Sequence, residues 1–284
     1  MYKKIIISEK QIKLLSEDTV GDGSVNPEIV RAYSFDWDDN IMSMPTTIKV
    51  VKNGENIEVS TDEYANIRNN PEYSLGDDAF DNFINDDNFL LDLGEAIKTK
   101  SFAPSFGKFK EALIFANPIS IITARGHKPE TIRLGMDMVI AETFSEYELL
   151  DMLENIQKIY PETEGMDAQE TLKMYLDSHD YHPVTSKIFA EKFGLRSGSA
   201  ANPEQNKKVA FRDYVEKIIN KTKEMVNTKY NKLSIGFSDD DLGNVKAIEG
   251  LIEKELKHEF PDVQFIIYDT SDGGNKKIVI KQVK

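Results

Sequence analysis

Two pairs of acidic residues follow strongly apolar segments of the chain, where their carboxylates could bind a metal ion. The pairs are Asp36 with Asp38 and Asp239 with Asp240. Residues two apart on an extended backbone point to the same side, so we expect Asp36 and Asp38 to face one small volume. Two carboxylates that close stay ionised together only if positive charge compensates them. Mg²⁺ is the usual compensating ion where carboxylates meet phosphate, so the four acids are predicted to hold Mg²⁺.

The spacing of these acids is a weak signal by itself, because the chain is rich in acids. Asp and Glu occupy 49 of the 284 positions. Chance alone then gives roughly eight acid-x-acid pairs, and solvated acidic turns are the alternative interpretation of each pair. A third apolar segment ends in Thr123, with Arg125 two residues later. Because both acidic pairs and Thr123 stand at the ends of apolar segments, we favour one shared site.

Four apolar segments predict the strands that position these residues. They cover residues 30–35, 118–123, 233–237 and 263–268. Helices are expected over 106–115, 129–139, 145–160, 167–176, 186–193, 203–226 and 244–258. This alternation predicts an α/β fold, a Rossmann-like three-layer sandwich with a mostly parallel sheet and helices on both faces. Ligands bind such sheets at the carboxyl ends of the strands, where the candidate residues stand.

Other stretches have a different character. Residues 1–28 are predicted to be an N-terminal segment and linker, rich in Gly, Asp and Ser towards its end. Residues 41–103 are predicted to be an inserted cap, with a β-hairpin at an Asn-Gly turn and an acidic stretch over 76–92 made of loop and short helices. Residues 141–200 are predicted to be a second, helical insertion. Insertions in such a fold decide specificity by covering the site.

Four motifs, taken in chain order, resemble those of the haloacid dehalogenase-like (HAD) superfamily of phosphohydrolases. The first and fourth follow strands, the second ends a strand, and the third is a Lys near the start of a helix. They are Asp36-Trp-Asp38, Thr123, Lys207 or Lys208, and Asp239-Asp240-Asp-Leu-Gly-Asn244. The resemblance implies that residues 29–284 form a HAD-like catalytic domain with cap insertions. The inserted segment also resembles that of phage-encoded members of the superfamily.

The resemblance implies phosphoryl transfer through an aspartyl-phosphate. Asp36 would be the nucleophile, Asp38 the general acid and base, and Thr123 a hydrogen-bond donor to the phosphoryl oxygens. For the third-motif cation the choice lies among Lys207, Lys208 and Arg212, with a slight preference for Lys208. The remaining expected roles are substrate binding by Arg125, Lys207 and Asn40, and Mg²⁺ binding. The ion would be held by the Asp36 carboxylate, the Asp38 carbonyl and Asp239, with Asp240 nearby or binding through water.

The substrate prediction divides between two classes. The formal charge of −14 opposes general nucleic-acid binding, which needs cations to displace counterions. We therefore expect a small phosphorylated molecule, such as a nucleotide. The alternative is a polynucleotide 3′-phosphatase, because Thr123-Ala-Arg125 resembles the Thr-Gly-Arg run in the phosphatase domain of phage polynucleotide kinase/phosphatases. A non-catalytic HAD-fold binding protein is a further alternative, which the retention of all four motifs opposes.

Composition also bears on where the protein acts. The chain has no Cys, which excludes disulfides, thiolate metal sites and Cys nucleophiles. Its first residues contain only three consecutive apolar side chains, whereas a secretory signal needs roughly 7–15. We expect a cytoplasmic protein without a membrane partner, in the host cytoplasm if the chain is phage-encoded.

Overall fold

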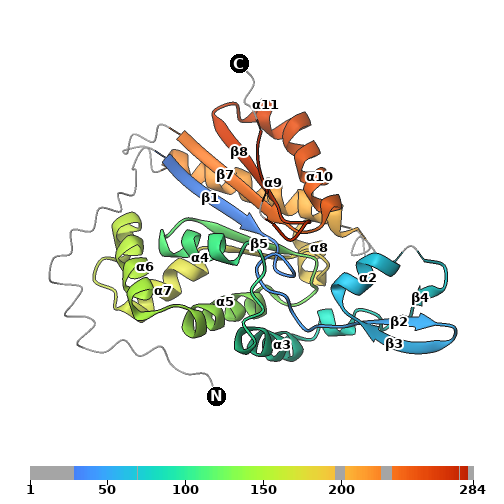
Figure 1. Ribbon diagram of the computed structural model, residues 1–284. Coiled ribbons are helices and arrows are strands. Elements are labelled where there is room, and N and C mark those ends of the chain that lie inside the picture. The colour runs from blue at the N-terminus through green and yellow to red at the C-terminus, as the bar shows by residue number, and fades with distance from the viewer. Residues whose placement is uncertain (1–28, 69, 196–201, 225–231, 275, 281–284) are drawn as a thin grey trace.

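A six-stranded sheet forms the centre of the protein in the computed structural model, which describes residues 29–68, 70–195, 202–224, 232–274 and 276–280 (Figure 1). The predictions for residues 1–28 lie outside these residues. The strand order is β6-β5-β1-β7-β8-β9. Five neighbouring strands are parallel, and β9 alone pairs in the antiparallel direction. The strands are β1 (Ile29–Phe35), β5 (Ile119–Thr123), β6 (Asp180–Pro183), β7 (Lys232–Asp239), β8 (Val263–Asp269) and β9 (Lys276–Val279).

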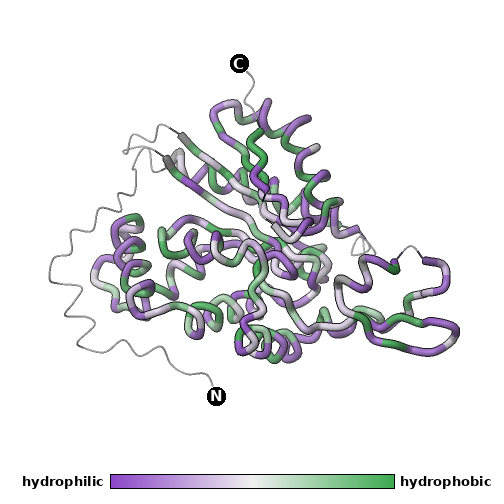
Figure 2. Tube along the Cα trace, viewed as in Figure 1, coloured by the Kyte–Doolittle hydropathy of each residue, from purple (hydrophilic) through white to green (hydrophobic). Residues whose placement is uncertain are grey.

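Helices cover both faces of this sheet, as predicted. One face carries α3 (Asp86–Lys98), α4 (Phe106–Ile114), α5 (Pro129–Thr143), α6 (Glu146–Ile159) and α7 (Ala168–Asp177). The other carries α8 (Lys187–Lys192), α9 (Pro203–Glu224) and α10 (Leu242–Leu251), the last continued by a π-helical turn (Ile252–Leu256) and α11 (Lys257–Glu259). Along these helices hydrophobic and hydrophilic residues alternate (Figure 2), which is the pattern of a helix with one buried side.

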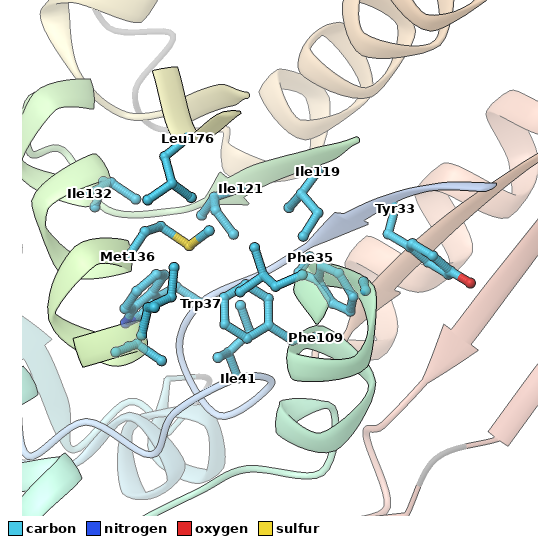
Figure 3. Close-up of a cluster of buried hydrophobic side chains, with 14 of the residues drawn as sticks. Tyr33, Phe35, Trp37, Ile41, Phe109, Ile119, Ile121, Ile132, Met136 and Leu176 are labelled. Atoms are coloured by element: carbon cyan, nitrogen blue, oxygen red, sulfur yellow. The ribbon is translucent and has the colours of Figure 1, made fainter. Parts of the chain in front are cut away.

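Alternation along the strands divides the core into two clusters. Tyr33 and Phe35 of β1 belong to the cluster under α3–α7, whereas Ala32 belongs to the cluster under α8–α10. Ile121 and Ile122 of β5 divide in the same way, because successive strand residues point to opposite faces. Figure 3 shows the first cluster, in which Phe35 and Ile121 meet helix residues such as Phe109 and Met136. Full burial of each such side chain contributes about 1.5–3 kcal/mol.

The insertion after β1 builds a small unit of its own at one end of the molecule (Figure 1). Its three antiparallel strands are β2 (Ile48–Lys52), β3 (Glu55–Val59) and β4 (Tyr73–Leu75), in the order β3-β2-β4. The predicted hairpin is confirmed: Asn53 and Gly54 have φ of 53° and 85°, as a tight hairpin turn requires. A separate hydrophobic cluster around Ile48, Val50 and Val59 holds the unit together with α2 (Thr61–Ile67). We call residues 48–75 the cap unit.

Two inserted segments are more closely tied to the main domain than the sequence predicts. Helix α3 lies partly within the acidic stretch predicted as loop with short helices, because Phe89, Leu93 and Ala96 give its acidic sequence one buried side. The helical segment predicted over 141–200 contains helices and one strand. That interval contains β6, an edge strand of the main sheet, and its helices α6 and α7 pack into the main core.

The base of the first insertion is closed by backbone hydrogen bonds. The Ser105 N–H donates to the Asn40 carbonyl (2.8 Å), and the Ala103 N–H donates to the Ile41 carbonyl (3.1 Å). The chain therefore leaves and re-enters the main domain at neighbouring points. Within the described residues, no helix has the length and apolar character needed to cross a membrane.

Candidate active site

The candidate residues meet where β1 and β7 end side by side. These strands are parallel neighbours, and Phe35 pairs with Ser238. Beyond that pair, the Asp36 N–H donates to the Ser238 carbonyl (2.9 Å). Carboxylate oxygens of Asp36, Asp239 and Asp240 all lie within 4.8 Å of one another. The structure thus brings together the carboxylates of three predicted metal-binding residues, and we call Asp36, Asp239 and Asp240 the acid cluster.

Lys207 is the cation of this cluster. From the first turns of α9, its Nζ lies 3.1 Å from Asp36 Oδ2 and 2.7 Å from Asp239 Oδ2. The side chain is only 1% exposed. A Lys is rarely buried to this degree unless it is paired, so its position is explained by the two carboxylates.

The preference for Lys208 as the third-motif cation is wrong in this geometry. Neighbouring residues on a helix point about 100° apart, so only one of Lys207 and Lys208 can face the acids. Lys208 is half-buried and forms no ion pair with any residue that the structure describes. Arg212 faces elsewhere, and its guanidinium binds Glu255 and Glu259 at 2.5 and 2.8 Å.

The acid cluster carries more negative than positive charge. Burial raises the pKa of Asp36 to about 8, and the carboxylates of Asp239 and Asp38 add to the effect that Lys207 opposes. Burial also raises the pKa of Asp240 to about 9, with Asp36 and Asp239 contributing. Burial disfavours the charged form of Lys207, but Asp239 and Asp36 outweigh it and hold the Lys207 pKa above its ordinary value. One ammonium is insufficient for three carboxylates.

A hard divalent cation fits the acid cluster. Asp36 Oδ1 is buried and has no hydrogen-bond partner among the described residues, although it is a carboxylate oxygen beside two other acids. Asp239 is held in place by the Asn244 side chain (3.0 Å), the Asp241 N–H (3.0 Å) and Lys207. Mg²⁺ prefers such oxygen ligands, and added positive charge lowers the pKa of neighbouring carboxyls. The residues present therefore suit Mg²⁺.

Asp38 has a different partner. Arg125 Nε donates to Asp38 Oδ2 (2.8 Å) and Nη2 donates to Oδ1 (2.6 Å), a bidentate ion pair. Arg125 is fully buried, lies over the rings of Phe83 and Phe89 (4.8 and 5.2 Å to the ring centroids), and donates a further bond to Thr46 Oγ1 (2.8 Å). The expected sharing of one volume by Asp36 and Asp38 is therefore incorrect for the Asp38 carboxylate, which a guanidinium already neutralises.

The arrangement also changes the roles expected of Arg125 and Asn40. Arg125 holds Asp38 in this conformation. The Nε and Nη2 atoms of Arg125 have hydrogen-bond partners, whereas its buried Nη1 has none among the described residues. Asn40 is fully buried and uses all of its hydrogen-bonding capacity. Its Nδ2 donates to the Asp36 and Ser238 carbonyls, and its Oδ1 accepts from the Ser238 and Thr270 hydroxyls. The predicted substrate-binding role of Asn40 is wrong in this geometry: it joins the ends of β1, β7 and β8.

Thr123 stands at the end of β5, as predicted. Its side chain is buried, and its Oγ1 accepts a long hydrogen bond from the Arg125 N–H (3.3 Å). This contact leaves the Thr123 hydroxyl proton available as a donor. The expected role towards phosphoryl oxygens is thus compatible with the position of Thr123, one strand away from Asp36 in the sheet.

The cap unit touches the loops of the site. Thr61 Oγ1 donates to Asp39 Oδ2 (2.6 Å), and Arg68 Nη1 lies 3.6 Å from Asp241 Oδ2. Asp39 adopts the left-handed conformation (φ 50°), which turns the loop after Asp38. Sequence reasoning missed Thr61 and Arg68, because their contacts join segments far apart in the chain.

Searches against protein-family models, curated proteins and solved structures find no match to this chain. The resemblance to the HAD superfamily consequently rests on the motifs themselves and on where their residues lie in the α/β fold.

Proposed function

We propose that this protein is a Mg²⁺-dependent phosphomonoesterase that works through an aspartyl-phosphate. The observation that carries the proposal is the meeting of Asp36, Asp239, Asp240 and Lys207 at the carboxyl ends of adjacent parallel strands. The HAD-like order of the motifs supports the same interpretation.

In the first step, an Asp36 carboxylate oxygen attacks phosphorus and the bond from phosphorus to the leaving oxygen breaks. The new bond makes the aspartyl-phosphate. Lys207, 3.1 Å from Asp36, offsets negative charge on the carboxylate and on the transferred group. Thr123 would donate its hydroxyl to a phosphoryl oxygen. Mg²⁺, held by Asp36, Asp239 and Asp240, would neutralise charge on the phosphoryl group.

Asp38 is the proposed proton carrier. Its carboxyl gives a proton to the leaving oxygen, then takes one from the water that attacks phosphorus and releases Asp36. The bidentate pair with Arg125 engages both carboxylate oxygens of Asp38. Asp38 therefore acts as an acid only after its carboxyl has left Arg125, and we place this exchange at substrate binding.

The proposed substrate is a small phosphorylated molecule. The buried, paired state of Arg125 removes one reason to expect a polynucleotide, since this cation is engaged with Asp38. Acids that contact the cap unit, Asp39 and Asp241, would repel a second phosphate of a nucleic-acid strand. A compact monoester held by the metal, Thr123 and Lys207 avoids this repulsion.

The test is a phosphate-release screen with Mg²⁺ over nucleotides, sugar phosphates and 3′- or 5′-phosphorylated oligonucleotides. Acid quenching followed by peptide mass spectrometry should find a phosphoryl group on the peptide that contains Asp36. Preferred turnover of an oligonucleotide, with a steep loss of affinity in salt, would replace the small-molecule proposal by end repair. If no phosphomonoester is hydrolysed and no phosphoryl group is trapped, the enzyme proposal is wrong.

A further inference from the structure

A second group of metal-binding side chains lies between the edge strand β6 and helix α9. Asp180 and His182 are two residues apart on β6, so both face the same side of the sheet. Helix α9 brings Asp213 to them, and one ligand atom from each of the three lies within 4.8 Å of the others. None of the three belongs to the acid cluster, and we call them the edge cluster.

His182 is the member that points to a ligand. Its side chain is 3% exposed, and its Nε2 is buried without a hydrogen-bond partner among the described residues. Nε2 faces Asp213 Oδ2 at 3.7 Å, too far for a hydrogen bond. The rings of Phe189 and Phe193 lie at 5.9 and 6.1 Å from the imidazole centroid. A buried polar atom left unsatisfied costs about 1–3 kcal/mol, which a bound cation would remove.

In this structure, two lysines form ion pairs with the carboxylates of the edge cluster. Lys217 Nζ lies 2.5 Å from Asp180 Oδ1 and 3.3 Å from Asp213 Oδ2, and Lys192 Nζ lies 3.2 Å from Asp213 Oδ2. Both lysine side chains are nearly half exposed, at 44% and 45%. Ion pairs of such exposed lysines contribute only about 0–1 kcal/mol, so a divalent ion can displace the ammonium groups into solvent.

We propose that Asp180, His182 and Asp213 form a second cation site, which binds a divalent transition-metal ion such as Zn²⁺. Imidazole and carboxylate are ordinary zinc ligands, and tetrahedral ligands about 2.0–2.1 Å from zinc lie roughly 3.3 Å apart. The separation of 3.7 Å between His182 Nε2 and Asp213 Oδ2 needs only a small shift. Two carboxylates and a neutral imidazole balance the charge of the ion. Burial lowers the pKa of His182 to about 4, so its imidazole is neutral at pH 7.

The bound ion would join the edge strand to the helix that carries Lys207. Strand β6 pairs along one side only, with β5. A metal bridge from β6 to Asp213 fixes α9 against the sheet six residues after Lys207. The edge cluster is therefore proposed to stabilise the fold rather than to take part in catalysis.

The experiment is a calorimetric titration of the full chain, without an affinity tag, with Zn²⁺ in the presence of excess Mg²⁺. The excess Mg²⁺ is added to compete for the acid cluster, and we expect one Zn²⁺ to bind per chain. Asp213→Asn should weaken Zn²⁺ binding at least about tenfold, as loss of a ligand should exceed the 10–100-fold losses known for outer partners. The matched control is Asp177→Asn, which removes a half-exposed acid that pairs with Arg133 and Lys173 and is not a member of the edge cluster.

Two further measurements identify the site. Nitrogen-15 NMR of the histidine side chains should show a shift of His182 Nε2 on addition of Zn²⁺. The titration repeated on Asp36→Asn should give the same Zn²⁺ stoichiometry, because the acid cluster is not involved. Equal Zn²⁺ affinity of wild type and Asp213→Asn, or loss of the Zn²⁺ site in Asp36→Asn, would overturn the proposal. These readouts need no enzymatic activity, so they fail or succeed independently of the proposed phosphatase function.

Discussion

Asp36 and Asp38 are two residues apart, yet they stand in opposite electrostatic surroundings. Asp36 shares one ammonium with Asp239 and Asp240, and burial raises its pKa to about 8. Asp38 forms a bidentate ion pair with the guanidinium of Arg125, with nitrogen–oxygen distances of 2.8 and 2.6 Å. The first group lacks positive charge, whereas the second is balanced.

The difference teaches how to recognise a cation site in a structure without ligands. Clustered acids alone are uninformative, because surface acids are abundant in this chain. A buried excess of negative charge is informative, since the group must bind a cation or take up protons to remain buried. By this criterion the acid cluster must bind a cation or take up protons, whereas the Asp38–Arg125 pair needs neither.

The largest expected effect is on catalysis. Asp36→Asn keeps the size of the side chain but removes the nucleophile, so we expect kcat for the best substrate of the screen to fall about 10⁴-fold or more. Circular dichroism should show an unchanged fold. Asp77→Asn, a change of an exposed acid on the inserted segment, is the control and should leave kcat unaltered. Activity above about 1% of wild type in Asp36→Asn would exclude the nucleophilic role.

The next effect separates Lys207 from its neighbour. Lys207→Met leaves buried carboxylates without a cation and should lower the free energy of unfolding by about 3–5 kcal/mol in EDTA at pH 8. Lys208→Met, the same change one residue later, should stay within about 0.5 kcal/mol of wild type. Urea denaturation of both variants measures the difference. Equal losses would mean that Lys207 does not neutralise the acid cluster.

A double-mutant cycle tests the balance of the Asp38–Arg125 pair. Unfolding free energies of Arg125→Met, Asp38→Asn and the double variant should give a coupling energy of about 1–3 kcal/mol. Because this pair is already neutral, the coupling should be the same with and without Mg²⁺. A coupling that disappears when Mg²⁺ is added would place Asp38 with the acid cluster instead.

A further expected effect is on the pH dependence of stability in EDTA. Asp36 and Asp240 have folded-state pKa values near 8 and 9, above their ordinary value of 3.8. Between about pH 4 and 8 the folded chain therefore binds more protons than the unfolded chain, so this contribution to stability decreases as pH rises and levels off above about pH 9.

Thermal unfolding of wild type and Asp240→Asn across this range measures the contribution, because other titrating groups cancel in the difference. Asp240→Asn should gain stability relative to wild type as pH rises from 5 to 9. Mg²⁺ at 100 times its Kd should stabilise wild type by about 2.7 kcal/mol and reduce this difference. A difference that is independent of both pH and Mg²⁺ would contradict the charge excess.

Much of the sheet was predictable because its inner strands are continuous apolar runs. Strands β1, β5, β7 and β8 were all predicted, since both of their faces are buried. The edge strands were missed. Strand β6 reads Asp-Tyr-His-Pro and β9 reads Lys-Lys-Ile-Val, and edge strands are short and polar because only part of their surface is covered.

The site was predictable in its residue types but less so in their pairing. The sequence places acids and Thr123 at strand ends, but it does not show that Arg125 reaches back to Asp38 across the fold. The spacing of apolar residues along the helix favours Lys207 over Lys208, although the sequence analysis did not use it. Lys207 precedes Ala210, Phe211 and Tyr214 by three, four and seven residues, which puts it on the buried stripe of α9.

The separate core of the cap unit has a consequence for how substrate reaches the site. Few side chains hold the unit together, so its local opening requires less free energy than global unfolding. Amide protons of β2 and β3 should therefore exchange with solvent sooner than those of β1 and β7. We expect the hydrogen bonds that close the base of the insertion to stay intact during such opening, because they lie outside the cap unit. We therefore expect the cap unit to open locally, so that a substrate can enter and a product can leave. During this opening Asp36, the proposed nucleophile, should keep its backbone hydrogen bond to Ser238.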